Sequence, residues 1–310
     1  MKKTVGILIV LVVVLVGTGL ALNWEPDRSV ADLSARWAAA PSTFVDVMGM
    51  QVHLRDQGPQ DDPTPIVLLH GTSASLHTWE GWVNELKGSR RVITFDLPGF
   101  GLTGPFPDGD YHMEHYVAFV TGLLDKLGVN RFVVGGNSLG GAVAWNVALA
   151  QPTRVERLIL VDAGGYPDPD AVMPIGFKLA QIPVLKPVIE RLMPRSVVES
   201  SLKDAYGNPA KVDQALVDRY FDLALRAGNR GSLVDRFQDL KPGEGYEQIA
   251  SLQVPTLIIW GDLDTLIPPA SAVRFKEDIK GSELAMFKGL GHVPQEEDPV
   301  ATVKRVKAFL

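Results

Sequence analysis

One short stretch constrains the fold of this chain more than any other. An apolar, β-prone run at residues 131–134 stops at glycines, and a run of small and apolar residues compatible with a helix follows at residues 142–150. Between the two runs stand Gly136, Ser138 and Gly140. A serine at the tip of so sharp a turn takes a positive φ and brings strand and helix so close that side chains at the two glycine positions would collide. The pattern therefore predicts strand, tight turn and helix, with Ser138 raised clear of the sheet.

The backbone around this turn offers hydrogen-bond donors. The first amides of the helix, that of Leu139 foremost, would point to the place where an oxyanion forms if Ser138 attacked a carbonyl group. A second donor is expected in the loop after the apolar strand at residues 65–70, because that loop carries a glycine and small residues that let a substrate approach the backbone. The candidates there are the N–H groups of Thr72 and Ser73.

A serine hydroxyl is a poor nucleophile at neutral pH, and it needs a histidine base that a carboxylate orients. His292 stands in a glycine-flanked loop after an expected strand, and Asp264 lies a few residues beyond another strand. In a parallel sheet both side chains arrive at the carboxyl edge, where Ser138 stands. Asp262 is a rival for the role of Asp264, and Asp162, at the end of the preceding strand, is a weaker one.

The composition excludes several classes of site. The chain has 310 residues, a formal net charge of -6 and no cysteine. A basic stripe that would bind nucleic acid is missing from the sequence. Without cysteine there is no disulfide, no thiolate catalysis and no cysteine-ligated metal, and the redox compartment stays open. The expected chemistry calls for neither a metal nor an organic cofactor.

The N-terminal segment, residues 1–22, is predicted to enter a membrane. Lys2 and Lys3 precede an uncharged, apolar run at residues 4–22, which as a helix would span about 28 Å, close to the ~30 Å hydrocarbon core of a bilayer. The two lysines place the N-terminus in the cytoplasm and the rest of the chain on the extracytoplasmic side, periplasmic or outer. The alternative is a signal segment that is cleaved, which would leave a secreted or periplasmic protein. We favour the retained transmembrane anchor.

A juxtamembrane connector is expected at residues 23–42, with a short helical pattern in its middle. Leu33 and Trp37 share one face of that helix, and they would rest either on the bilayer interface or on the catalytic domain. An antiparallel hairpin follows at residues 43–56. In it, His53 is expected to point outward from its strand rather than to act as a ligand.

The remainder divides into a catalytic core and an insertion. Apolar strands alternate with helices in residues 43–165 and again in residues 252–310, as in a mostly parallel sheet with helices on both faces. Residues 166–251 lack a strand pattern and are far longer than the ~10–12 residues that a crossover needs. The sequence therefore predicts an α/β fold with a helical cap inserted over the catalytic face.

Five segments carry a family resemblance, and they stand in this order along the chain: His70-Gly71, Asp96-x-Pro98-Gly99-x-Gly101, Gly136-Asn137-Ser138-Leu139-Gly140-Gly141, Gly261-x-x-Asp264 and Gly291-His292. They resemble the motifs of the α/β-hydrolase fold superfamily, and the resemblance runs from about residue 43 to the C-terminus. It implies Ser138 as the nucleophile, His292 as the general base and acid, and Asp264 as the orienting carboxylate.

The resemblance also bears on the branch of the superfamily. Haloalkane dehalogenases and epoxide hydrolases carry aspartate at the nucleophile position, so Ser138 argues against both. The segment around Ser138 is similar to that of bacterial lipases and esterases and to that of the C–C bond hydrolases of aromatic ring cleavage. The ring-cleavage enzymes are soluble, and they usually have more glycine after the His-Gly pair than residues 72–75 contain.

We therefore expect a membrane-anchored bacterial esterase or lipase that cleaves a small-molecule carboxylic ester through an acyl-enzyme. The substrate is expected to be hydrophobic, because residues 172–185 of the cap are apolar enough to line an acyl pocket, although a cap buries one face on the core in any case. Two alternatives stay open: a C–C bond hydrolase of meta-cleavage-product type, and a non-catalytic, ligand-binding member of the fold. The expected partners are the ester and, through residues 1–22, a membrane, but not nucleic acid.

Overall fold

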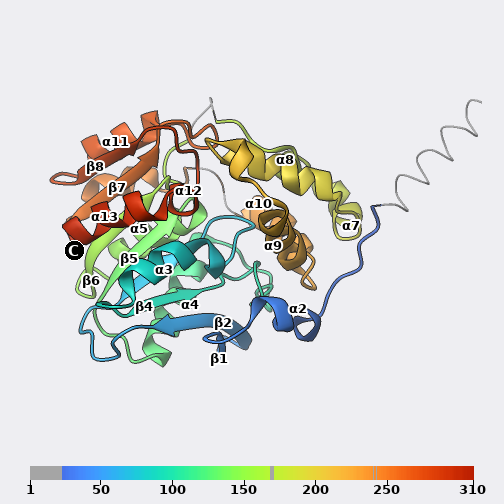
Figure 1. Ribbon diagram of the computed structural model, residues 1–310, viewed down its shortest axis with the longest axis horizontal. Helices are drawn as coiled ribbons and strands as arrows, with labels where there is room; N and C mark the ends of the chain where they lie inside the picture. The colour runs from blue at the N-terminus through green and yellow to red at the C-terminus, as the bar shows by residue number, and fades with distance from the viewer. Residues whose placement is uncertain (1–22, 168–170, 240, 242) are drawn as a thin grey trace, which may run out of the picture.

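An eight-stranded sheet forms the centre of the molecule (Figure 1). The computed structural model describes residues 23–167, 171–239, 241 and 243–310. The strands are β1 (Thr43–Val47), β2 (Met50–Gln57), β3 (Ile66–Leu69), β4 (Val92–Phe95), β5 (Phe132–Asn137), β6 (Val155–Val161), β7 (Thr256–Gly261) and β8 (Glu283–Phe287). Their spatial order is β1-β2-β4-β3-β5-β6-β7-β8. The β1–β2 and β2–β4 pairs are antiparallel and the other pairs are parallel.

Helices cover both faces of this sheet. Every residue of β3, β4 and β7 is buried, as expected for strands with helices on both sides. One face packs against α3 (Glu80–Leu86) and α13 (Pro299–Phe309). The other face packs against α4 (Met113–Lys126), α5 (Leu139–Ala150) and α11 (Ala270–Asp278). The predicted α/β class with a mostly parallel sheet is confirmed.

The insertion is helical. In the described part of residues 166–251 the chain forms helices and turns, and its only β contacts there are isolated bridges to the connector. Figure 1 shows α7 to α10 gathered on one side of the sheet. Prolines stand at the start of several of these short helices, where a missing N–H has no intrahelical partner to lose. The helices are α6 (Ile175–Ala180), α7 (Lys186–Ile189), α8 (Arg195–Ala205), α9 (Gln214–Ala224) and α10 (Asn229–Asp239).

Short helices complete the described chain. The 3-10 turn η1 lies directly before α3, and α12 directly before α13. Their bounds are η1 (Leu76–Trp79), η2 (Pro183–Leu185), η3 (Pro209–Lys211), η4 (Tyr246–Ser251) and α12 (Pro294–Glu297).

The connector rests on the protein. Its helix α2 (Val30–Trp37) begins with a capping box, which satisfies the first free amides. Leu33 is buried and packs with Leu102 of the core and Leu223 of the cap. The sequence left two packing surfaces open for Leu33, the bilayer interface and the catalytic domain. In the structure Leu33 packs on the catalytic domain.

His53 does not point outward, so that prediction is wrong. Its ring is fully buried, with Nδ1 2.7 Å from Asp96 Oδ2 and Nε2 2.9 Å from the hydroxyl of Ser42. The reason is Asp96, a fully buried carboxylate that needs donors. Burial works against its ionisation, but the charge and hydrogen bond of His53 hold the pKa of Asp96 well below its usual range.

The predicted membrane segment, residues 1–22, lies outside the described residues. Among the residues that are described, no helix has both the length and the hydropathy to cross a bilayer. The anchor thus stays a prediction.

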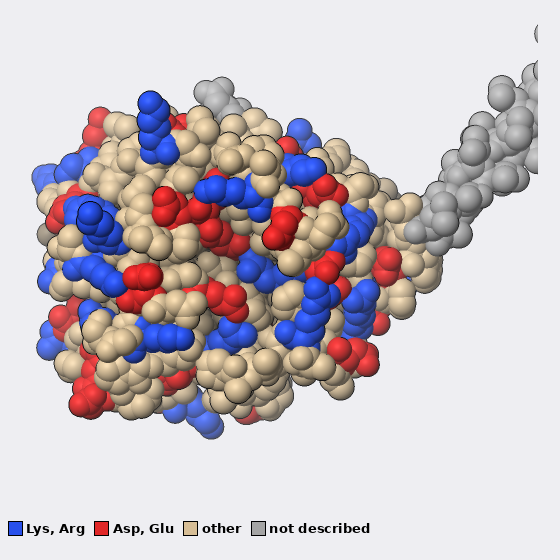
Figure 2. Space-filling model, viewed as in Figure 1, with Lys and Arg blue, Asp and Glu red and all other residues tan. Residues whose placement is uncertain are grey.

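Charged side chains are mixed over the surface. On the face drawn in Figure 2, Lys and Arg alternate with Asp and Glu, without a continuous basic stripe on that face. Several arginines are paired, as Arg91 is with Asp56 at 2.7 Å and Arg90 with Asp62 at 2.8 Å. This pattern agrees with the expectation that nucleic acid is not a partner.

Candidate active site

The strand-to-helix turn has the geometry that its sequence predicts. Ser138 lies between β5 and α5 with φ 55° and ψ -118°. A Cβ on Gly136 would collide with the carbonyl group of Gly140, and a Cβ on Gly140 with the carbonyl group of Leu69. Only glycine fits at these two positions, because backbone atoms occupy the place that a Cβ would take at each. The turn presents Ser138 to the cavity above the sheet.

His292 and Asp264 form a close pair beside this turn. His292 Nδ1 lies 2.8 Å from Asp264 Oδ2, and both side chains are buried. The other carboxylate oxygen accepts the N–H groups of Leu266 at 2.8 Å and Ile267 at 3.0 Å. A carboxylate so held keeps the proton of the imidazole on Nδ1 and leaves Nε2 free to accept one. His292 and Ser138 line the same cavity.

The two rival carboxylates do not occupy the place of Asp264. Asp262 accepts the N–H of Gly289 at 2.6 Å and bonds to no histidine. Asp162 does reach the cluster, where oxygens of Asp162 and Asp264 and a ring nitrogen of His292 lie within 4.8 Å of one another. Burial and the nearby charge of Asp264 raise the pKa of Asp162 well above its ordinary value. Asp264, and not Asp162, is the carboxylate that bonds to Nδ1 of His292.

The expected oxyanion donors lie at the cavity. Leu139 and Thr72 both line it, and neither N–H has an acceptor within the described part of the chain. Ser73, the other candidate in that loop, has φ 60°. Ser73 lines the cavity as well, so the amides of Leu139, Thr72 and Ser73 are the candidate donors for a developing negative charge.

His70 fixes the loop that carries Thr72, a role that the sequence analysis missed. Its Nδ1 donates to the carbonyl of Gly71 at 2.8 Å, and its Nε2 accepts the N–H of Leu97 at 2.9 Å. Full burial lowers the pKa of His70. The ring stays neutral, because only the neutral form donates with one nitrogen and accepts with the other.

Two further residues outside the predicted set support the loop that carries His292. The amide of Asn137 donates to the carbonyls of Val161 at 3.1 Å and His292 at 2.9 Å. Glu297 accepts the N–H of Gly291 at 2.6 Å. Asn137 and His292 are 155 residues apart in the sequence, so no local pattern could have shown this contact.

The cavity over the triad is large and mostly apolar. Its volume is about 590 Å³, and both the core and the cap contribute to its walls. Aliphatic and aromatic side chains of the cap supply most of the upper wall. Examples are Met173, Phe177, Leu192, Val197, Leu233 and Phe237.

Curated relatives of the chain include several C–C bond hydrolases. The 2-hydroxy-6-oxo-2,4-heptadienoate hydrolase of Pseudomonas putida is 29% identical, over 84% of this chain and 93% of that enzyme. The 2-hydroxymuconate semialdehyde hydrolase of a Pseudomonas species is 28% identical, over 84% and 91%. These names fit the alternative of the sequence analysis, C–C hydrolysis, better than its ester prediction.

Solved structures show a wider range of activities. A meta-cleavage product hydrolase from Pseudomonas fluorescens matches with a TM-score of 0.73 and 25% identity, over 86% of this chain and 96% of the other. A membrane phospholipase A, described as a bacterial virulence factor, matches with a TM-score of 0.72 and 25% identity, over 100% of this chain and 98% of the other.

A family model also matches the chain. The model, which describes the alpha/beta hydrolase fold, matches residues 64–299 and so covers well over half of the sequence. That range holds the serine turn, the Asp264–His292 pair and the whole cap. The chain therefore belongs to the alpha/beta hydrolase fold family and is a hydrolase of that fold.

Proposed function

We propose that this hydrolase cleaves carboxylic esters with hydrophobic acyl groups through an acyl-enzyme on Ser138. The observation that carries the proposal is one arrangement. A serine at positive φ and a histidine paired with a buried aspartate line the same large, mostly apolar cavity. Such a cavity favours an acyl chain, since each buried methylene contributes about 0.8 kcal/mol.

The reaction follows from the geometry in two halves. Ser138 Oγ attacks the ester carbonyl while His292 Nε2 takes its proton, and the N–H groups of Leu139 and Thr72 bind the oxyanion, each contributing about 3 kcal/mol. The proton on His292 then goes to the leaving alcohol. Water repeats the sequence on the acyl-enzyme and releases the carboxylic acid. Asp264 keeps the imidazole oriented throughout.

An activity-based probe tests the nucleophile. Purified protein and a Ser138→Ala variant are treated with a fluorophosphonate, and the intact masses are measured. We expect one adduct on the wild type and none on the variant. A folded wild type that takes no adduct would reject the proposal and favour the non-catalytic alternative.

A series of p-nitrophenyl esters tests the hydrophobic substrate. We expect kcat/KM to rise with acyl length until the cavity is filled, by up to roughly fourfold per methylene if each is fully buried. Turnover confined to the acetate ester, with none for longer chains, would contradict a hydrophobic acyl site.

C–C bond hydrolysis is the second candidate, and the names of the curated relatives favour it. The same triad would then act on the carbonyl group of a vinylogous diketone formed by ring cleavage. The decisive comparison is kcat/KM for such a dienoate, followed by loss of its visible absorption, against that of the best ester. A higher value for the dienoate would replace the ester proposal.

We further propose that residues 1–22 anchor the protein in a membrane, with the catalytic domain on the extracytoplasmic side. The match to the membrane phospholipase A supports this proposal, because it extends over 100% of the chain whereas the match to the meta-cleavage product hydrolase covers 86%. Membranes from expressing cells are washed with alkaline carbonate, and the mass of the retained chain is measured. Release by carbonate, or a chain that begins after residue 19, would contradict a retained anchor.

A further inference from the structure

One face of α10 forms part of the cavity wall over Ser138. Asn229, Arg230, Leu233, Arg236 and Phe237 all line the cavity. Their spacing places them on one stripe of the helix, because residues three and four apart lie above one another. Two of the five side chains on this apolar wall are arginines.

Arg236 is buried and has no counter-charge among the residues that the structure describes. It is 6% exposed and makes no hydrogen bond or ion pair to any residue that the structure describes, and its Nε is both buried and without an acceptor. The guanidinium lies over the ring of Phe237, 4.2 Å from its centroid. Burial lowers the pKa of Arg236, with the Tyr116 phenol as the only group that opposes this. A buried cation without a partner destabilises the folded state. Its presence in the cavity wall therefore suggests a function in binding.

Arg230 repeats the pattern in part. It is 5% exposed, and one terminal nitrogen pairs with Asp27 at 2.7 Å. Its Nε and Nη1 are buried and have no acceptor. Lys241 also lines the cavity, and Glu244 is the only acidic side chain among the described residues that does so. Glu244 is exposed and pairs with neither arginine. The cavity wall therefore carries more positive than negative charge.

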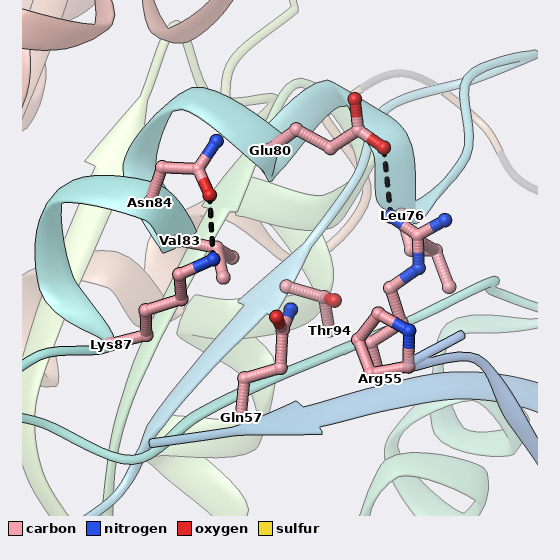
Figure 3. A pocket seen from close by; sticks show the side chains of 9 residues that line it. Arg55, Gln57, Leu76, Glu80, Val83, Asn84, Lys87 and Thr94 are labelled. Atoms are coloured by element: carbon pink, nitrogen blue, oxygen red, sulfur yellow. Dashed lines mark hydrogen bonds and ion pairs between the residues drawn. The ribbon is translucent and has the colours of Figure 1, made fainter. Parts of the chain in front are cut away.

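Several cationic side chains outside the catalytic cavity have partners. Figure 3 shows a smaller cavity of about 180 Å³ in which the guanidinium of Arg55 pairs with Glu80 at 2.7 Å and the ammonium of Lys87 donates to Asn84 at 2.8 Å. In the cap, Arg219 pairs with Glu296 at 2.6 Å. Among the described residues, Arg236 differs from these three cations, because it has neither a carboxylate nor another acceptor.

We infer that the substrate carries an anionic group, a carboxylate or a phosphate, which enters the cavity and pairs with Arg236, with Arg230 beside it. This inference rests on the proposed ester hydrolysis and names the substrate class more closely. The apolar walls hold the chain between the anion and the ester, while Ser138 attacks the carbonyl. Arg236 is then a specificity-determining residue, because a neutral substrate of the same length would leave its guanidinium unpaired.

A pair of esters that differ in one group tests this inference. Mono-p-nitrophenyl suberate ends in a carboxylate, and p-nitrophenyl octanoate has the same acyl length but no charge. We expect Arg236→Gln to raise KM for the suberate at least about tenfold, as for the loss of one buried charge pair, and to lower the ratio of kcat/KM for the suberate to kcat/KM for the octanoate by at least the same factor. Arg236→Lys should restore part of the affinity. Arg131→Gln is the matched control, because Arg131 is exposed and pairs with Glu156 before β5.

Inhibition of the wild type gives a readout that needs no variant. Octanoate and octyl phosphate should each inhibit at least about tenfold more strongly than octanol, since only they bring a counter-charge for Arg236. The stronger of the two identifies the anion as carboxylate or phosphate. Equal inhibition by all three compounds, or an Arg236→Gln variant that keeps the wild-type ratio of kcat/KM for the two esters, would overturn the inference.

Different measurements test the anion site and the proposed ester hydrolysis, so that one can fail without the other. If neither ester is turned over and the fluorophosphonate does not react, the proposed function is wrong. Thermal shift of the Ser138→Ala variant with octanoate or octyl phosphate still tests the anion site, because binding needs no chemistry. We expect a rise in Tm that Arg236→Gln abolishes, and no rise would count against the site.

Discussion

At the scale of single residues, the environment separates two neighbouring carboxyl groups. Asp264 receives two backbone N–H groups in addition to His292. Asp162 receives the N–H of Gly261 at 3.0 Å, and its second oxygen is buried without a partner. Burial and the nearby charge of Asp264 raise the pKa of Asp162. Asp264 thus pairs with the imidazole, and Asp162 beside it is the carboxyl group whose proton is harder to remove.

The raised pKa of Asp162 predicts a pH dependence of stability. Its pKa is raised in the folded protein, whereas an unfolded aspartate titrates near its ordinary value. As the pH rises from that value to the folded pKa, the unfolded state loses a proton that the folded state keeps, so stability falls by about 1.4 kcal/mol per pH unit. Asp162→Asn removes this loss. We expect the Tm of the variant to gain on the wild type between pH 5 and pH 8.

The observation against this prediction would be a constant difference in Tm between Asp162→Asn and the wild type over that range. Asparagine suits the comparison, because Asp162 has φ 42° and asparagine tolerates this region of the backbone.

The orienting role of Asp264 predicts a large kinetic effect from a small chemical change. Asp264→Asn keeps the shape of the side chain but removes the charge that fixes the tautomer of His292, so kcat should fall by about 10³-fold or more. Asp262→Asn is the matched control, and its activity should stay near that of the wild type. Ester hydrolysis at constant pH measures both variants. An equal loss in the control would assign the role to Asp262 instead.

At the scale of elements, one carboxylate fastens the connector to the cap. Asp222 of α9 accepts from Arg28 at 2.7 Å, from Arg36 at 3.1 Å and from the indole of Trp37 at 3.1 Å. The first donor precedes α2 and the other two end it. Figure 1 shows α2 close to α9. The connector is therefore a packed part of the described molecule rather than a free tether.

This fastening predicts the effect of Asp222→Ala. The variant leaves three donors without their acceptor, and we expect the free energy of unfolding to fall by about 2–3 kcal/mol. Urea unfolding followed by circular dichroism measures the loss, and limited proteolysis should show earlier cutting between residues 23 and 42. Glu199→Ala is the control: it removes an exposed pair with Lys203 and should change neither measurement. Equal behaviour of the two variants would show that Asp222 does not hold the connector.

At the scale of the whole molecule, the sequence predicted the framework better than the contacts across it. Apolar runs and glycine turns are local, so the strands, the turn at Ser138 and the chain order of the triad could be read directly. The predicted outward orientation of His53 was wrong because its partner Asp96 is 43 residues away in the sequence. The alternation of residues within one strand does not show that a buried carboxylate lies beside it. That Arg236 has no acidic partner among the described residues could not be predicted for the same reason, because it depends on where acidic residues distant in the sequence lie in the fold.

Core and cap are joined by a buried cluster around Glu296 of α12. Its two carboxylate oxygens accept from Arg219 at 2.6 Å, from the hydroxyl of Tyr206 at 2.8 Å and from that of Tyr220 at 3.0 Å. Glu296 lies four residues after His292 in the sequence. The position of the cap therefore depends on a carboxylate in the segment that follows His292.

This dependence leads to a prediction for two variants together. Glu296→Gln leaves the Arg219 guanidinium buried without a counter-charge, so the free energy of unfolding should fall by about 3 kcal/mol or more. Adding Arg219→Met removes the uncompensated charge, and we expect the double variant to regain most of that stability. Ester hydrolysis should fall in Glu296→Gln as well, because the loop of His292 loses its support. Additive losses in a double-mutant cycle would show that the two side chains do not act as a pair, and that the cap is held on the core by its apolar contacts instead.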